Sequence, residues 1–354
     1  MKDKIILLFL FLFAIFFFSK KIEKPQAIDA KYYYEMARKI PQLDSIPLPF
    51  KQRILAPFLA KLLSSNLSLN FFILSLITIL IFIFLFYHYL LKKEIRKETA
   101  LLIIFFLLFN KYHFGCFIFD FYRLNEILAL LLILLFFYGL EIKNFLLLLF
   151  AFFLGVLARE IVVLLCLVAL FYTFKEKKND YFLACLPGLG IFIFVRLLFK
   201  DNDFSYLVSA LFDYGKKIYS LSALFRLFIN AFAPLTLIPI IEYQLTFSYI
   251  KRNFDKFLFF ILIFLSTLLG KDNERLMAPV FIFFYPLIGE IFERKMKDKK
   301  FLILLAILGF PSAFHHYWNR FPIKRDLTMI LSFFSLFSIT LTYYFIGIRN
   351  KERY

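Results

Sequence analysis

The chain has few of the residues that break helices and few of those that bind metals. Its 354 residues include 10 Gly, 12 Pro, 4 His and 3 Cys. Cys116, Cys166 and Cys185 lie in or next to apolar blocks, and their spacing fits neither a zinc site nor a disulfide framework. His315 and His316 have no third ligand at useful spacing, so we interpret them as an interfacial or solvated pair. We expect the cysteines to be small packing residues.

Acidic residues are also scarce. The sequence has 25 Asp and Glu against 43 Lys and Arg, which gives a formal net charge of +18. In a soluble protein this excess would suggest nucleic acid as a partner. Here the basic residues cluster between apolar blocks, at 92–97, 175–178 and 294–300. Such clusters are typical of cytoplasmic loops beside anionic headgroups. We therefore expect membrane lipids, and no nucleic acid, as partners.

Apolar residues dominate the composition. They make up 62% of the chain, with 55 Phe and a mean hydropathy of +0.78, whereas ordinary domains are about 45–50% apolar. They form blocks and not the alternating segments of a β-barrel. We predict an all-α polytopic membrane protein of about twelve transmembrane helices, in a single domain over residues 1–354. Ile5–Phe18 is predicted to be an uncleaved first helix, because Ser19-Lys20-Lys21 follows it instead of a cleavage site.

The block at residues 145–174 decides how the chain is threaded. Its 30 residues would form a straight helix of about 45 Å, too long for one upright span and too short for two. The basic segments 92–97 and 175–178 predict the same, cytoplasmic side for both of its flanks. We expect the block to enter and return on that side, with Ala158-Arg159-Glu160 at its tip. Both termini are then cytoplasmic.

This threading brings polar residues from separate loops to the outer side. The long first loop, at 19–68, carries Asp29 and Arg53, and the later loops and the tip carry Asp120, Arg159, Glu160, Asp272, Arg275 and Trp318. Charges at the edge of a membrane are costly to keep there, so their gathering on one face predicts a functional site.

Two amphipathic helices in the membrane interface are predicted within the first outer loop. Apolar positions recur at helical spacing over Asp29–Ile40 and over Phe50–Leu63. Structural roles stay open for their polar residues. Asp29 stands where an N-cap would, the tyrosines suit an aromatic belt, and Arg53 could extend to the headgroups.

Four short motifs follow one another along the chain. They are Asp29-x-x-Tyr32-Tyr33, Arg53-Ile54-Leu55-Ala56-Pro57, Gly155-x-x-x-Arg159-Glu160 and Asp272-x-x-Arg275-Leu276-x-x-Pro279. In this order, after a first helix and within a long outer loop and its successors, they resemble the GT-C membrane glycosyltransferases. The resemblance covers roughly residues 1–290 and rests on the order of the motifs more than on any one of them.

The resemblance implies a glycosyltransferase that moves a sugar from a polyprenyl-phosphate donor to a glycan, lipid or protein acceptor. It would be a cell-envelope enzyme in the inner membrane of a prokaryote. Its active site would lie on the extracytoplasmic face. Asp29 would act as general base or orient the acceptor hydroxyl. Guanidinium groups suit the donor phosphate, and the candidates are Arg53, Arg159 and Arg275. The candidates for sugar or acceptor contact are Tyr32, Tyr33, Asp120, Glu160, Asp272 and Trp318.

Two questions remain open at the level of sequence. The first outer loop has no Asp-Asp or Asp-x-Asp pair, so we assign no metal ligand, although a divalent metal is not excluded. The alternatives in function are another enzyme of lipid-linked glycans, of the O-antigen polymerase or ligase type, and a transporter or flippase. The former typically has its largest outer loop late in the chain, and the latter favours internal repeats and broken helices at mid-depth.

Overall fold

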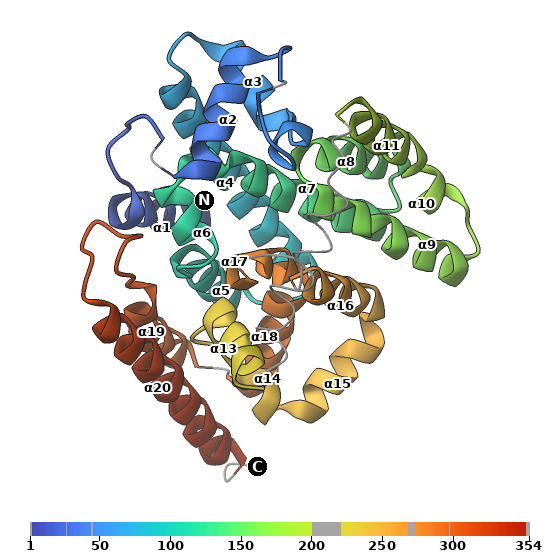
Figure 1. Cartoon of the computed structure of the whole chain (residues 1–354). Helices are drawn as coiled ribbons and strands as arrows, with labels where there is room; N and C mark the ends of the chain where they lie inside the picture. Colours follow the sequence, from blue (N-terminus) through green and yellow to red (C-terminus); the bar gives the residue numbers. More distant parts are fainter. Residues whose placement is uncertain are drawn as a thin grey trace.

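The computed structural model describes residues 2–25, 27–43, 45–199, 221–267, 273–296 and 298–351. It is 80% helix, and the described residues contain no strand (Figure 1). Five helical stretches are long and apolar enough to cross a membrane: Leu67–Lys92, Phe121–Ile142, Asp180–Leu198, Asn273–Lys295 and Arg325–Ile346. The all-helical prediction is confirmed, and the other apolar blocks form shorter helices such as Phe145–Ala158.

The helices, with the short 3₁₀ turns labelled η, follow one another in this order: α1 (Lys2–Phe18), α2 (Ile28–Lys39), η1 (Phe50–Gln52), α3 (Leu55–Leu63), α4 (Leu67–Lys92), α5 (Lys97–Phe109), α6 (Phe114–Phe119), η2 (Phe121–Arg123), α7 (Leu124–Ile142), α8 (Phe145–Ala158), η3 (Glu160–Leu164), α9 (Leu165–Glu176), α10 (Asp180–Leu183), α11 (Leu186–Leu198), α13 (Leu221–Phe232), α14 (Ile238–Ile241), α15 (Tyr243–Arg252), α16 (Phe254–Thr267), α17 (Asn273–Leu276), η4 (Ala278–Val280), α18 (Phe281–Lys295), α19 (Lys299–Gly309), η5 (Phe310–Ala313) and α20 (Arg325–Lys351).

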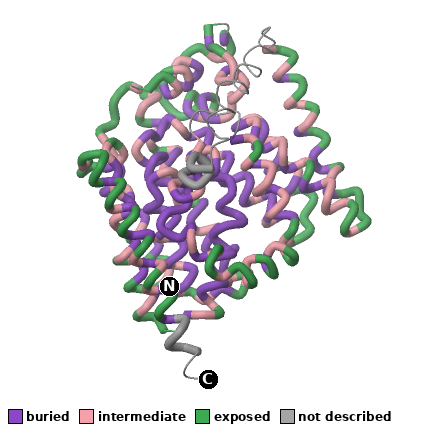
Figure 2. The backbone as a smooth tube through the Cα atoms, turned by 60° about the horizontal axis from the view of Figure 1, so that its bottom comes forward, coloured by how far each residue is buried: buried purple, intermediate pink, exposed green. Residues whose placement is uncertain are grey.

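Helix α7 lies in the main buried cluster and packs against α4 and α8. Figure 2 shows buried backbone through the middle of the molecule, with exposed segments around it. Lipid tails are as apolar as Leu, so such packing depends on close contact between helices. Gly139 provides it between α7 and α8, because a Cβ there would lie 3.1 Å from Leu148 Cδ2. Asn144 caps α8 by accepting a hydrogen bond from the Leu147 N–H at 2.9 Å.

A second buried cluster joins α2 and α3 to the starts of α4 and α7. Helix α2 buries Tyr33 and Met36, as its apolar spacing predicts. Two details differ from the expectation. Asp29 is not an N-cap, because α2 starts at Ile28 and Asp29 lies in its first turn. The second segment is not one helix: it breaks at Arg53, whose carbonyl accepts a hydrogen bond from the side chain of Asn125.

The block at 145–174 is divided near the predicted point. Helix α8 ends at Ala158, Arg159 is extended with φ −159° and ψ 137°, and η3 begins at Glu160. The flanks of the block then meet, because Lys143 Nζ lies 3.0 Å from Glu176 Oε2. The segment therefore leaves and returns to the same side of the molecule, as its length and basic flanks predict.

Charged side chains gather at the two ends of α7 and leave its middle apolar. At the C-terminal end, Glu141 pairs with Lys93 at 2.5 Å and with Lys256 at 3.4 Å. At the N-terminal end, Arg123 and Glu126 join a larger network of ion pairs. Residues 127–140 between them carry no charge, which suits a helix that crosses an apolar layer.

Candidate functional site

Arg53, between η1 and α3, is the centre of the long segment that connects α1 to α4. Its Nε and Nη2 both donate to the Glu160 carboxylate, the former at 2.8 Å, and its Nη1 donates to the Tyr33 hydroxyl at 2.9 Å. Its Cζ also lies 5.7 Å from the centre of the Phe50 ring. A planar guanidinium can hold a carboxylate with two hydrogen bonds, which fixes the geometry as well as the charge. Two predicted site residues 107 positions apart thus meet directly.

The guanidinium of Arg53 affects the pKa values of both of its partners, Glu160 and Tyr33. Burial alone would raise the pKa of Glu160, but the charge and hydrogen bonds of Arg53 outweigh it and hold that pKa at about 2. Burial raises the pKa of the Tyr33 hydroxyl, against the opposing effect of Arg53. At neutral pH the carboxylate is therefore ionised and the phenol is neutral.

Glu126, in the first turn of α7, collects three arginines. Its carboxylate pairs with Arg275, lies 3.5 Å from Nη1 of Arg159 and lies 3.5 Å from Nη1 of Arg123. The Glu126 side chain is only 5% exposed, so these cations balance a charge that would otherwise be costly to bury. Sequence reasoning missed this residue, although a carboxylate at the start of an apolar helix, three positions after an arginine, was a signal in the sequence.

Asp29 and Asp120 approach the same network through Arg123. The Arg123 Nε donates to Asp120 Oδ2 at 2.9 Å, and its Nη1 lies 3.9 Å from Asp29 Oδ2. The Asp29 side chain is 42% exposed, while that of Asp120 is 10% exposed. Asp29 is therefore the carboxylate of this pair that a ligand from outside can reach.

Asn125 joins the two halves of the site. Its Oδ1 accepts from the Ala56 N–H at 3.1 Å, and its Nδ2 donates to the Arg53 carbonyl at 3.2 Å. The side chain is fully buried, so it fixes the start of α3, and with it Arg53, against α7. The Asn125-Glu126 dipeptide thereby holds both the Arg53 backbone and the Arg159 and Arg275 side chains.

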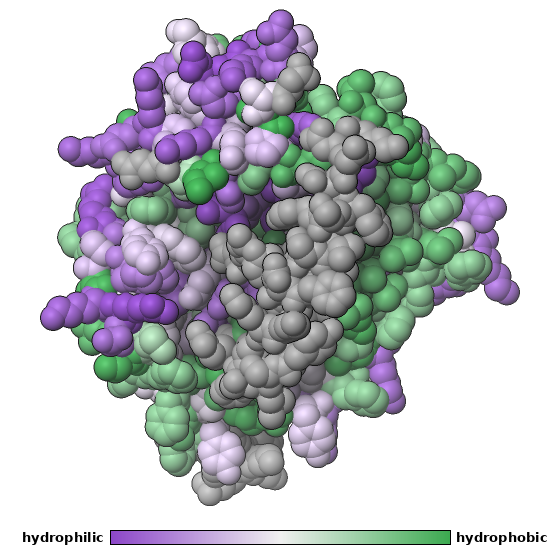
Figure 3. Space-filling model, viewed as in Figure 1, coloured by the Kyte–Doolittle hydropathy of each residue, from purple (hydrophilic) through white to green (hydrophobic). Residues whose placement is uncertain are grey.

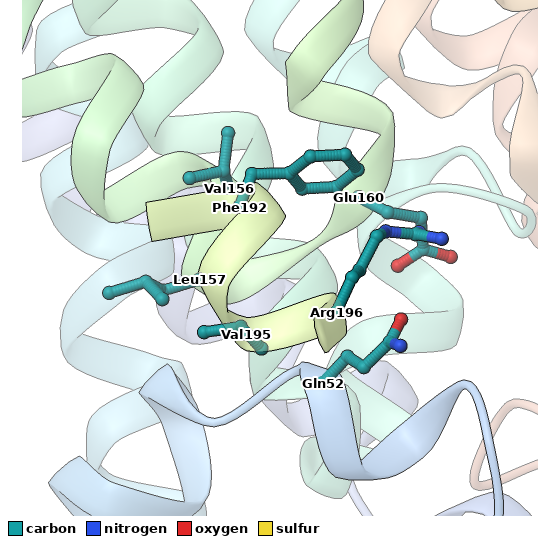
Figure 4. A pocket seen from close by; sticks show the side chains of 7 residues that line it. All are labelled: Gln52, Val156, Leu157, Glu160, Phe192, Val195 and Arg196. Atoms are coloured by element: carbon teal, nitrogen blue, oxygen red, sulfur yellow. The ribbon is translucent and has the colours of Figure 1, made fainter. Parts of the chain in front are cut away.

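A small pocket opens beside Glu160, between η1, α8 and α11. It is lined by Gln52, Val156, Leu157, Glu160, Phe192, Val195 and Arg196. In Figure 4 the polar ends of Arg196, Glu160 and Gln52 lie on one side of it, and the valines and Leu157 lie on the other.

Arg196 is the cation of this pocket, and the sequence did not single it out. Among the described residues it has no carboxylate within 4.0 Å, and its buried Nε has no hydrogen-bond partner. Its Cζ lies 4.5 Å from the centre of the Phe192 ring. Arg53, Arg123, Arg159 and Arg275, in contrast, each pair with a carboxylate. Arg196 therefore differs from them in having a guanidinium that no carboxylate of the described residues neutralises.

The surface around the pocket changes from polar to apolar. Figure 3 shows hydrophilic residues over α2 and α3, and hydrophobic residues over α8 to α11. On α11 the side chains of Ile193, Phe194, Leu197 and Leu198 are all more than half exposed. Such a helix suits contact with lipid. Arg196 lies on this helix and lines the same pocket as Gln52 of η1.

The remaining predicted residues are distributed as follows. Tyr32 packs against Phe50, with ring centres 4.9 Å apart and the rings tilted by 34°. Trp318 lies in a separate cluster with Tyr112 and His315, so it is not brought to Arg53. Asp272 lies outside the described residues. Within the part of the chain that the structure describes, no three His, Cys, Asp or Glu are placed to hold a metal ion.

Comparisons with known proteins give no independent assignment. No family model, no curated protein and no solved structure matches this chain.

Proposed function

We propose that this chain is a membrane glycosyltransferase that moves a sugar from a polyprenyl-phosphate donor to an acceptor hydroxyl. The observation that carries the proposal is the meeting of three motifs far apart in sequence. Arg53 binds Glu160, and Arg159 and Arg275 share Glu126. Charged side chains in a membrane protein cost free energy to bury, so an assembly of this size indicates a functional site. The proposal includes about twelve membrane spans. It also includes α2 and α3 as interfacial helices on the extracytoplasmic side of the membrane.

Asp29, the exposed carboxylate of the network, has the role of general base in this reaction. The acceptor oxygen attacks the anomeric carbon of the sugar, the bond from that carbon to the phosphate oxygen breaks, and the electron pair leaves with the polyprenyl phosphate. Asp29 takes the proton of the acceptor hydroxyl, because it is the accessible carboxylate beside Arg123. Tyr32, next to Asp29 on α2, offers an aromatic face for a sugar ring.

The phosphate of the donor needs cations as charge grows on the leaving oxygen. Arg196 supplies a guanidinium that is not neutralised by a described carboxylate, in a pocket with apolar walls that suit the first part of a lipid chain. Arg53 and Arg159, which were expected to bind the phosphate, hold Glu160 and Glu126. In this proposal they shape the site, and a phosphate reaches them only by sharing their charge.

The test is transfer by the purified protein from polyprenyl-phosphate sugars, followed as released polyprenyl phosphate. We expect Asp29→Asn to lower kcat by about 10²–10⁴-fold without changing the melting temperature. Glu35→Gln is the matched control, since Glu35 lies on the same helix and makes only exposed ion pairs. Activity of Asp29→Asn equal to that of the control would remove Asp29 from the reaction.

The Arg196 role has its own test in the same assay. We expect Arg196→Gln to raise KM for the donor by about tenfold or more, because a charge-assisted hydrogen bond to phosphate is lost. Arg38→Gln, at an exposed arginine of α2, is the control. An unchanged KM in Arg196→Gln would place the donor phosphate elsewhere.

A further inference from the structure

Lys111, in the turn between α5 and α6, is a buried cation that the proposed mechanism does not use. It is 7% exposed, and its Nζ donates to Ser332 Oγ at 2.7 Å. That hydroxyl in turn donates to the Thr328 carbonyl at 2.9 Å. No described carboxylate lies within 4.0 Å of Lys111 Nζ, and buried lysines without a counterion are rare.

Lys111 lies among groups of both charges and two histidines. Burial lowers the pKa of Lys111 to about 8, against the opposing effect of Glu274, so the amine is mostly protonated at neutral pH. Burial, together with Lys111, His316 and Arg325, lowers the pKa of His315 to about 3, so this imidazole is neutral. The cluster thus contains the cations Lys111 and Arg325, the Glu274 carboxylate, which acts on Lys111 from beyond 4.0 Å, and neutral imidazoles that can donate a hydrogen bond.

Two further polar atoms of the cluster lack hydrogen-bond partners among the residues that the structure describes. Asn319 is 4% exposed, and its Oδ1 accepts from the His315 N–H at 3.0 Å. Within the described part of the chain, its buried Nδ2 has no hydrogen-bond partner, and neither has His316 Nδ1. Lys111 lies close enough to His315 to lower the pKa of that imidazole, so the amide N–H and the amine belong to one cluster. Such an amide N–H is a donor that an incoming acceptor would satisfy.

Aromatic rings complete the cluster. Trp318 stacks on His315, with ring centres 4.2 Å apart, and meets the edge of Tyr112 at 5.2 Å. We propose that Lys111, Asn319 and Trp318 form a binding site for an oxyanion, a phosphate or carboxylate group, that is separate from the Arg53 network. If the proposed function holds, this oxyanion belongs to the acceptor, and that role alone rests on the proposed function.

The chain reports on this site by itself, because Trp318 is its one tryptophan. Full-length protein in detergent and phosphate-free buffer is titrated with inorganic phosphate, with glucose 1-phosphate and with glucose, and Trp fluorescence is followed. We expect saturable changes with both phosphates and none with glucose. Tighter binding of glucose 1-phosphate than of phosphate identifies an oxyanion carried on a sugar, and equal binding identifies a free oxyanion. A response to glucose as strong as that to glucose 1-phosphate overturns the proposal.

Variants separate the site from the fold. Lys111→Met keeps the apolar stem and removes a buried charge that pairs with no described carboxylate within 4.0 Å, so we expect it to fold. We expect its dissociation constant for phosphate to rise by about tenfold or more. Lys324→Gln, at an exposed lysine in the loop that carries Trp318 and Asn319, is the control and should bind as the parent does. Parental affinity in Lys111→Met, or no saturable response in the parent, overturns the proposal. No sugar donor is present, so a failure of the proposed transfer reaction would not affect this result.

Discussion

Arg53 and Glu160 form a partly buried pair whose two members come from different helical turns. The Arg53 side chain is 13% exposed and that of Glu160 is 32% exposed. Replacing Glu160 with Gln keeps the shape but removes the countercharge of Arg53. We expect Glu160→Gln to lower the free energy of unfolding by about 1.5–3 kcal/mol, the range for hydrogen bonds to charged groups. Thermal unfolding in detergent measures it.

The matched control for this change is Glu290→Gln. Glu290 pairs with two arginines, Arg252 and Arg294, but these are 51% and 48% exposed, so the loss should be about 0–1 kcal/mol. Equal destabilisation by the two substitutions would show that the Arg53–Glu160 pair contributes no more than a surface ion pair does.

Acid tests the same pair in the parent protein. The pKa of folded Glu160 is about 2, below the value of about 4.3 for an unfolded chain. A lowered pKa contributes stability that is fully present above the unfolded value and is lost as the pH falls toward the folded value. We expect the difference in melting temperature between the parent and Glu160→Gln to be constant near pH 6 and to shrink from about pH 4.3 downward. A difference that stays constant to about pH 3 contradicts this.

At the scale of elements, the break between α8 and η3 positions Arg159 and Glu160. Gly155 permits this turn, because a Cβ at Gly155 would lie 2.5 Å from Val162 Cγ1. We expect Gly155→Ala to destabilise the protein by about 1–3 kcal/mol through overpacking. The double variant Gly155→Ala, Val162→Ala should recover part of this loss, which a double-mutant cycle of unfolding free energies measures.

Gly190 provides the control for that prediction. It lies within α11, and a Cβ there would meet nothing within 4 Å. Gly190→Ala should therefore be neutral or stabilising by up to about 1 kcal/mol, because Ala favours the helix. If Gly155→Ala behaved in the same way, the glycine of the Gly155-x-x-x-Arg159-Glu160 motif would not be explained by packing.

The sequence predicted those parts of the site that depend on length, periodicity and charge. The division of residues 145–174 followed from a block too long for one span, and the structure breaks it at Arg159. Glu126, Asn125 and Arg196 were missed, because their importance depends on which distant groups they meet. The apolar spacing of α7 gives no sign that Asn125 reaches the Arg53 carbonyl, 72 residues away.

At the scale of the whole molecule, the network of Arg53 and Glu126 and the pairs of Lys93 and Lys143 lie at different ends of the helices. Helix α7 carries Glu126 at its start and Glu141 at its end, about 22 Å apart at 1.5 Å per residue. Basic loops favour the cytoplasmic side, so the end with Lys93 should face the cytoplasm and the end with Arg53 should face outward.

Cysteine labelling tests this orientation. Lys31, on α2, and Lys178, after α9, are both exposed, while Cys116 and Cys185 are buried and Cys166 is partly buried. In intact cells without an outer barrier, we expect Lys31→Cys to react with a membrane-impermeant maleimide. Lys178→Cys should react only after permeabilisation, and the parent protein gives the background. Labelling of both variants from the same side would contradict the proposed orientation, because Asp29 and Arg53 share the loop of Lys31 and would then not lie across the membrane from the basic loops.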